Sequence, residues 1–300
     1  MVTFRFSGNH LVERSQTTCG FLRRGSVAPV GIYEICSRYP GGLLPSPAGK
    51  RHRMQFALAV AATFAITATA KDEAPGAREG QRSPVLVELF TSEGCSSCPP
   101  ADLLLEKLDR LQPIPGAEAI VLSEHVDYWN RIGWTDPYSS PAFSRRQEAY
   151  AHRFGLDGAY TPEMIVDGDA ELLGSDEPGA KVAIVSASQK EKAPIRLSRV
   201  PAGVRIEIDA FPGRGKAEVY LAMAQDSATS DVLRGENKGR RLHHVAIVRR
   251  LDPVGTISSR ARFNKQFPVK DADKSLRIIA FVQEPGNGRV WGAALLAPAK

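Results

Sequence analysis

Two cysteines separated by two serines, Cys95 and Cys98, are the residues of this sequence best suited to chemistry. Thiol–disulfide exchange needs an accessible thiolate and a second thiol close enough to resolve a mixed disulfide. The spacing of the pair meets the second need, and a helix beginning beside it would stabilise a thiolate. The same spacing is half of a structural zinc site, but the sequence has no second pair with this spacing to complete one.

The residues around the pair predict a strand, a loop, a helix and a second strand. Residues 85–90 are almost all apolar, which is typical of a strand covered on both faces. Residues 99–111 repeat leucines with helical spacing, and residues 119–123 form a second apolar strand. This order predicts a parallel strand pair with a right-handed crossover.

The rest of the chain divides by composition near residue 193. Before it we expect a helix, a hairpin at Asp167-Gly168 and a closing helix, over residues 141–154, 164–173 and 181–189. After it we expect strands at residues 195–199, 204–209, 217–224, 243–251, 275–282 and 290–296. The fold class predicted is an α/β domain (85–192), with a central mixed sheet flanked by helices, followed by a smaller all-β, sandwich-like domain (193–300).

The first 70 residues differ from the rest in charge and hydropathy. They hold eight basic and two acidic side chains, which accounts for the whole net charge of +6 and leaves no electrostatic support for a nucleic-acid partner. Residues 54–70 are uncharged, follow a basic cluster and end in Ala68-Thr69-Ala70, which is typical of a cleaved signal peptide. The alternative, a transmembrane anchor, needs about 20 apolar residues.

These features predict a periplasmic or secreted protein, cleaved near Ala70, that meets the membrane only during export. Residues 1–53 are then a leader, with the true translation start expected near its end, and residues 71–84 are a polar linker. Cys19 and Cys36 would be absent from the mature chain, which keeps only the Cys-x-x-Cys pair.

The order of the elements, with Thr161-Pro162 ahead of the hairpin, resembles the thioredoxin superfamily. The resemblance implies that Pro162 is a cis-proline facing the cysteine pair, and that it holds a substrate backbone together with Tyr160 and Thr161. The alternative is an ordinary trans-proline that opens a strand.

The same resemblance implies a buried acid on the strand before the cysteines. Glu88 is the candidate, although it lies seven residues before Cys95 where the superfamily has six. Burial would raise its pKa, so that it would take the proton of Cys98. The alternative is a carboxylate with an ion-pair partner.

Longer stretches are similar to an exported bacterial family, domain of unknown function 1223. These stretches are Val87–Asp102, His125–Trp129, Tyr160–Gly168 and Arg234–Asn237. The resemblance implies a fold and no activity. Pro99-Pro100 departs from ordinary thioredoxins: it predicts a helix that starts at Pro99, with Ser97 or Cys98 as its cap. Cys95 would then precede the helix, so we expect its pKa to be less depressed than in a strong oxidant.

Three functions follow from these residues. The first is a thiol–disulfide oxidoreductase without a cofactor, in which Cys95 is the attacking thiolate and Cys98 the resolving thiol, and whose partners are protein thiols or disulfides of the cell envelope. The second is a copper or other soft-metal module in which His125 joins the two cysteines, because thiolates favour Cu(I). The third is an envelope binding protein in which the pair is a structural disulfide.

Several other side chains have both a functional and a structural interpretation. His125 is either a ligand or a loop histidine bonded to a backbone carbonyl. Trp129 either lines a groove beside the cysteines or belongs to the core. The stretch from Arg234 to Arg241 is expected to be a solvated hairpin loop. His243 and His244 should point to opposite faces of their strand, so a shared metal is not expected.

Overall fold

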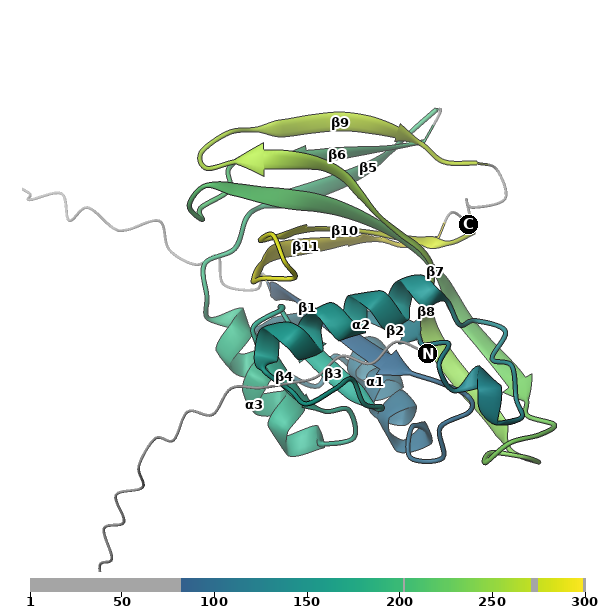
Figure 1. Cartoon of the computed structure of the whole chain (residues 1–300). Helices are drawn as coiled ribbons and strands as arrows, with labels where there is room; N and C mark the ends of the chain where they lie inside the picture. The colour runs from purple at the N-terminus through teal and green to yellow at the C-terminus, as the bar shows by residue number, and fades with distance from the viewer. Residues whose placement is uncertain (1–81, 202, 271–274, 299–300) are drawn as a thin grey trace, which may run out of the picture. The chain divides into compact units, whose positions relative to one another are not determined.

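The computed structural model describes residues 82–201, 203–270 and 275–298 (Figure 1). The predicted leader, the signal-peptide region and the linker as far as residue 81 lie outside the described residues, as do Cys19 and Cys36. Within the described ranges, no helix combines the length and the apolar character needed to span a membrane.

A mixed sheet of eight strands, in the order β11-β10-β7-β8-β2-β1-β3-β4, organises this part of the chain. Its first four strands in sequence are β1 (Ser83–Thr91), β2 (Ala117–His125), β3 (Glu163–Val166) and β4 (Ala170–Leu173). β1 pairs in parallel with β2 and antiparallel with β3. The predicted parallel pair is confirmed, and β1 is buried from Val85 to Thr91 because both of its faces are covered.

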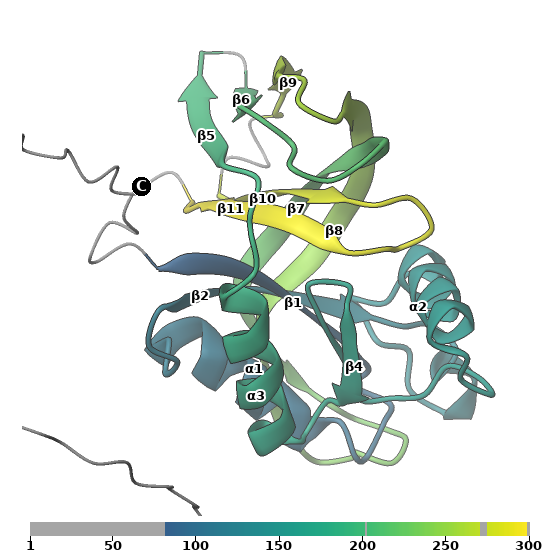
Figure 2. The ribbon, with the colours of Figure 1, turned by 90° about the vertical axis from the view of Figure 1, so that its left-hand side faces the viewer.

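Three helices cover the two faces of this part of the sheet (Figure 2). They are α1 (Pro99–Leu111), α2 (Pro141–Phe154) and α3 (Glu177–Ser188). Val85, Val87 and Leu89 of β1 pack in one cluster with α1 and α3. Leu86 packs on the other side, in a cluster that includes Phe143 of α2. The alternation of side chains along β1 therefore assigns each residue to one helix layer.

The strands after residue 193 divide between two sheets. The large sheet continues through β7 (Lys216–Asp231), β8 (Arg241–Ser258), β10 (Arg277–Gln283) and β11 (Val290–Leu296). A separate antiparallel sheet consists of β5 (Ile195–Val200), β6 (Gly203–Ile208) and β9 (Phe263–Pro268). Apolar side chains of the small sheet pack in one cluster with those of β7 and β10, which is a sandwich arrangement.

The boundary expected at residue 193 is a change of composition and not a break in the large sheet. β8 pairs in parallel with β2 at Ser123 and Ile247, and antiparallel with β7 along most of its length. Leu86 of β1 and Phe281 of β10 share one buried cluster. The two halves of the sheet are therefore stabilised by a common core.

Most predicted elements are present, with informative differences in their bounds. α3 begins at Glu177, earlier than predicted, because the Asp176 carboxylate caps it by accepting from the Gly179 amide. β7 and β8 are longer than predicted and form the extended hairpin of Figure 1. β9 was not predicted, because four of its six residues are exposed and half of the six are polar.

Candidate functional site

The cysteine pair lies where β1 passes into α1. Cys98 is the N-cap of α1 and Pro99 its first residue, as the double proline predicted. Cys95 precedes the helix and forms a disulfide with Cys98. Both cysteines are fully buried, whereas Ser96 and Ser97 between them are exposed. The loop is at the surface, but its sulfur atoms are covered.

The Thr161–Pro162 peptide bond is cis, as the resemblance implied. Ser97 Oγ donates to the carbonyl oxygen of Thr161 at 3.5 Å, so the residue before the cis-proline contacts the cysteine loop. Trp129 Nε1 donates to Thr161 Oγ1 at 2.7 Å, and the Trp129 side chain lies against Gly94. The structure therefore brings Thr161 and Trp129 to the loop.

Tyr160 has partners elsewhere. Its hydroxyl donates to the carboxylate of Glu171 on β4, and its carbonyl oxygen accepts from Gln147 of α2. No described contact brings its side chain to the cysteines. Its predicted part in binding a substrate therefore has no geometric support.

Glu88 does not face the cysteines, and the predicted proton transfer to it from Cys98 has no geometric basis. Its side chain lies on the α2 face of β1, opposite the face covered by α1. Glu88 Oε1 accepts from Arg146 Nε at 2.6 Å, and Oε2 accepts from the Tyr150 hydroxyl at 2.7 Å. The ion-paired carboxylate, the alternative of the sequence analysis, is what the structure contains.

Arg146 is the centre of a buried polar network on this face. Its side chain is 8% exposed and also donates to Gln283 of β10. Glu124 lies 3.8 Å from it, and burial together with the nearby charge of Glu88 raises the pKa of Glu124 well above its usual value. Burial likewise raises the pKa of Glu163 to about 7. The network joins α2 to both halves of the sheet.

His125 ends β2 and is fully buried, with Asp136 as its partner. His125 Nδ1 lies 2.7 Å from Asp136 Oδ2, which also accepts from the Glu93 amide at 2.9 Å. Burial alone would raise the pKa of Asp136, but the charge of His125 and its hydrogen bond lower it. His125 is therefore bonded to a carboxylate, which neither interpretation of the sequence had proposed.

The described residues contain no group of three or more His, Cys, Asp or Glu side chains that could hold a metal ion. The soft-metal site proposed for Cys95, Cys98 and His125 is thus not formed in this disulfide-bonded state. The sequence predicted that the adjacent histidines point to opposite faces of their strand, and their exposure agrees with this. His244 is buried, whereas the side chain of His243 is 34% exposed.

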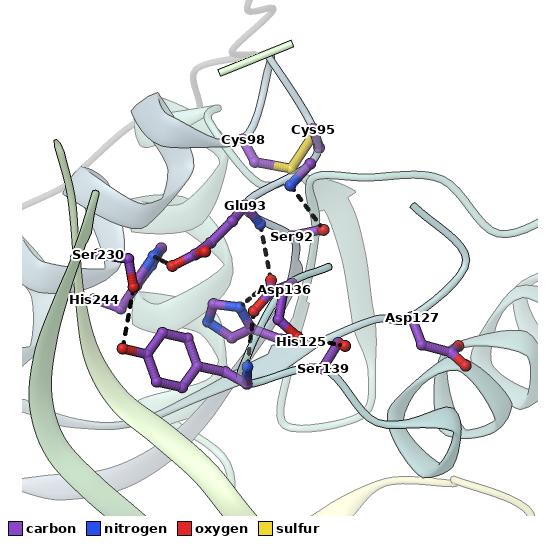
Figure 3. Close-up of polar contacts among 12 residues, drawn as sticks. Ser92, Glu93, Cys95, Cys98, His125, Asp127, Asp136, Ser139, Ser230 and His244 are labelled. Carbon is purple, nitrogen blue, oxygen red and sulfur yellow. Dashed lines mark hydrogen bonds and ion pairs between the residues drawn. A yellow bond between two sulfur atoms is a disulfide. The ribbon is translucent and has the colours of Figure 1, made fainter. Parts of the chain in front are cut away.

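A buried charged cluster lies behind the disulfide and was missed by the sequence analysis. It consists of Glu93, Asp102 and His244, each at most 6% exposed. Figure 3 shows Glu93 and His244. His244 Nε2 lies 3.3 Å from Glu93 Oε1, and its Nδ1 lies 3.8 Å from Asp102 Oδ1. Burial alone would lower the pKa of His244, but its interactions with the two acids raise it to about 10. His244 is therefore a cation at neutral pH.

The tip of the β7–β8 hairpin, residues 232–240, covers the cysteine loop. Asn237 is fully buried, and its Nδ2 donates to the carbonyl oxygens of Glu93 at 2.9 Å and of Cys95 at 2.8 Å. Glu236 Oε2 accepts from the Ser96 amide at 3.2 Å, and its hydrogen bonds to Ser96 lower the pKa of Glu236. Most of the tip is exposed, as predicted, but Asn237 belongs to the site.

These observations define a mixed α/β protein with a disulfide at the start of its first helix. Residues 86–283 match the family described as "Protein of unknown function (DUF1223)". The chain belongs to this family, as the stretches quoted in the sequence analysis had implied. Comparison with curated protein sequences found no match.

Two solved structures are similar to this chain. One is the crystal structure of a protein from Agrobacterium tumefaciens, with 28% sequence identity and a TM-score of 0.62, covering 73% of this chain and 96% of that one. The other is HBP35 of Porphyromonas gingivalis, with 15% identity and a TM-score of 0.48, covering 72% and 76%. The first likeness extends over nearly the whole solved chain, whereas the second is too distant to support a conclusion.

Proposed function

We propose that the protein acts in the cell envelope as a thiol–disulfide exchange protein through Cys95 and Cys98. The observation that carries this proposal is the placement of the disulfide, between the start of α1 and the loop of the cis-proline. Ser97 bridges the two by its hydrogen bond to the carbonyl oxygen of Thr161. The order of β1, α1 and β2, with Thr161-Pro162 ahead of β3, supports a thioredoxin-like α/β part, and residues 54–70 support export.

The proposed reaction balances two electrons and two protons. A partner thiolate attacks Cys95 Sγ, the bond between the two cysteines breaks, and Cys98 leaves as a thiolate. A second partner thiolate then attacks the partner sulfur of the mixed disulfide and releases Cys95. The partner becomes a disulfide, and the protons from its two thiols pass to the two cysteines. The reverse sequence reduces a partner disulfide.

The exchange requires that Cys95 become accessible, because both cysteines are fully buried. The hairpin tip contacts the cysteine loop through hydrogen bonds of two side chains, Asn237 and Glu236. Each such hydrogen bond contributes about 1 kcal/mol net, so a partner that displaces the tip would meet a modest barrier.

The test is to trap the mixed disulfide. In a Cys98→Ser variant expressed with its leader, we expect envelope proteins to remain attached to Cys95 and to be released by a reductant on gels. The double variant Cys95→Ser/Cys98→Ser is the control and should trap none. If Cys95 of the single variant is alkylated by a thiol reagent and yet carries no partner, the proposed function is wrong.

A second candidate is an envelope binding protein in which the pair is a structural disulfide. The complete burial of both cysteines favours it. A reduction potential below about −300 mV, together with an unchanged phenotype of the double Cys→Ser variant, would select this candidate. A higher potential would select exchange.

A further inference from the structure

The two acids of the charged cluster flank the cysteine pair in the sequence and meet again behind it. Asp102 lies four residues after Cys98, so both lie on the same face of α1, and the Asp102 amide donates to the Cys98 carbonyl oxygen at 3.1 Å. Glu93 lies two residues before Cys95. Figure 3 shows its side chain extending from beneath the disulfide toward His244.

His244 enters this space from β8, far along the chain. Among the described residues, no hydrogen bond of normal geometry reaches either ring nitrogen of His244, Oε1 of Glu93 or Oδ1 of Asp102. The histidine therefore acts on the two acids through its charge. The other polar groups around the cluster are Trp134, which donates to Glu93 Oε2 at 2.8 Å, and the His125 and Tyr138 rings, 4.7 Å and 5.9 Å from the His244 ring. The carboxylate of Asp136 is paired with His125.

We propose that His244, held between Glu93 and Asp102, is a positioning residue that sets how readily Cys98 leaves as a thiolate. This inference rests on the proposed exchange function and names the groups that tune it. Two buried carboxylates oppose a new negative charge on Cys98, and the imidazolium offsets one of them. Because charges interact strongly in a buried site, the balance among these three groups decides the energy of the thiolate.

The balance of charges predicts that the two kinds of variant shift the pKa of Cys98 in opposite directions. Asp102→Asn or Glu93→Gln removes one negative charge, so the Cys98 thiolate is stabilised and leaves faster. His244→Gln removes the positive charge, so the thiolate is destabilised and leaves more slowly. A role limited to packing would not produce opposite signs in the two kinds of variant.

The experiment uses the purified protein and two readouts. The first is the thiolate absorbance of the reduced pair as a function of pH, and the second is the rate at which dithiothreitol reduces the disulfide. We expect Asp102→Asn and Glu93→Gln each to raise the acid dissociation constant of Cys98 and the rate about tenfold. We expect His244→Gln to lower both. His243→Gln, a change of the neighbouring, partly exposed histidine, is the matched control and should alter neither by more than twofold.

The proposal is overturned if both carboxylate variants stay within twofold of the unmodified protein, or if His244→Gln leaves both readouts unchanged or raises them. Should His244→Gln fail to fold, the two nearly isosteric carboxylate variants decide the question alone. Neither readout uses a protein partner. A negative trapping experiment with Cys98→Ser would therefore refute the proposed function without altering this result.

Discussion

Two clusters of buried acids occupy different sides of the same sheet, and each is balanced by a different cation. On the α2 face, Glu88 is paired with Arg146, which donates hydrogen bonds from its guanidinium. Beside α1, behind the disulfide, Glu93 and Asp102 lie 3.3 Å and 3.8 Å from His244, and within the described ranges neither forms a hydrogen bond of normal geometry with it. An arginine remains charged and forms directed hydrogen bonds, whereas the charge of a histidine depends on a pKa that its surroundings shift.

Because of this difference, we assign one cluster to the stability of the fold and the other to its chemistry. The Arg146 network ties α2 to β1 and β10, so we assign it to stability. The His244 cluster lies behind the only groups for which we propose a reaction, so we assign it to function. Variants of the two clusters should therefore affect different measurements.

The largest effect is expected from Arg146→Met. It would leave the carboxylate of Glu88 buried without its cation, and we expect the free energy of unfolding to fall by about 3–5 kcal/mol. Urea denaturation measures this loss. Arg145→Met changes the exposed neighbour of Arg146 and should alter stability by less than about 0.5 kcal/mol. Equal losses in both variants would contradict the role assigned to the network.

The second effect is a dependence of stability on pH that comes from Glu163 on the α2 face. Its pKa is about 7 in the folded chain and 4.5 without burial, so the folded state holds the proton more tightly. Stability should therefore fall as the pH rises from about 4.5 to 7, by about 3 kcal/mol, and then level off. Denaturation at several pH values should show this slope in the unmodified protein and a smaller slope in Glu163→Gln. An unchanged slope would contradict the prediction.

A direct contrast between the clusters comes from Glu88→Gln and Glu93→Gln. We expect Glu88→Gln to lower the free energy of unfolding by about 1–3 kcal/mol, because Arg146 loses a charged partner. It should leave the rate of disulfide reduction by dithiothreitol within twofold. Glu93→Gln should change that rate about tenfold. If Glu88→Gln changed the rate as much as Glu93→Gln does, the assignment of the two clusters to separate roles would fail.

The smallest effect concerns access to the disulfide. Asn237→Ala removes two hydrogen bonds between the hairpin tip and the cysteine loop. We expect dithiothreitol to reduce the disulfide about tenfold faster, which corresponds to about 1.4 kcal/mol in the opening of the tip. Lys238→Ala, a change of the exposed neighbour, should have no effect. A rate unchanged by Asn237→Ala would show that the tip does not limit access.

Features that depend on neighbouring residues were predictable. Pro99-Pro100 placed the start of α1, because proline suits only the first helical turn. The alternation of His243 and His244 placed them on opposite faces. The cis bond at Pro162 followed from the resemblance, and no local signal would have indicated it alone.

The role of Glu88 was misjudged because the sequence of a strand shows that successive side chains alternate between two faces of the sheet. It does not show which helix covers each face. Burial was foreseen, but the direction toward Arg146, fifty-eight residues away, was not. The long β8 was assigned to a separate domain for the same reason, since its pairing with β2 joins residues far apart in the sequence.

The sequence by itself determined the Cys-x-x-Cys pair, its place between a strand and a helix, and the family. Local propensities and periodicities suffice for the pair and its place, because they act over a few residues, whereas the family followed from the resemblance of longer stretches. Only the tertiary structure decided that His244 and Asn237, about 140 residues or more from the cysteine loop, complete the site. The order of the strands in the sheet brings them there. The strength of the interaction between the buried charges depends on their distances, which cannot be read from the sequence.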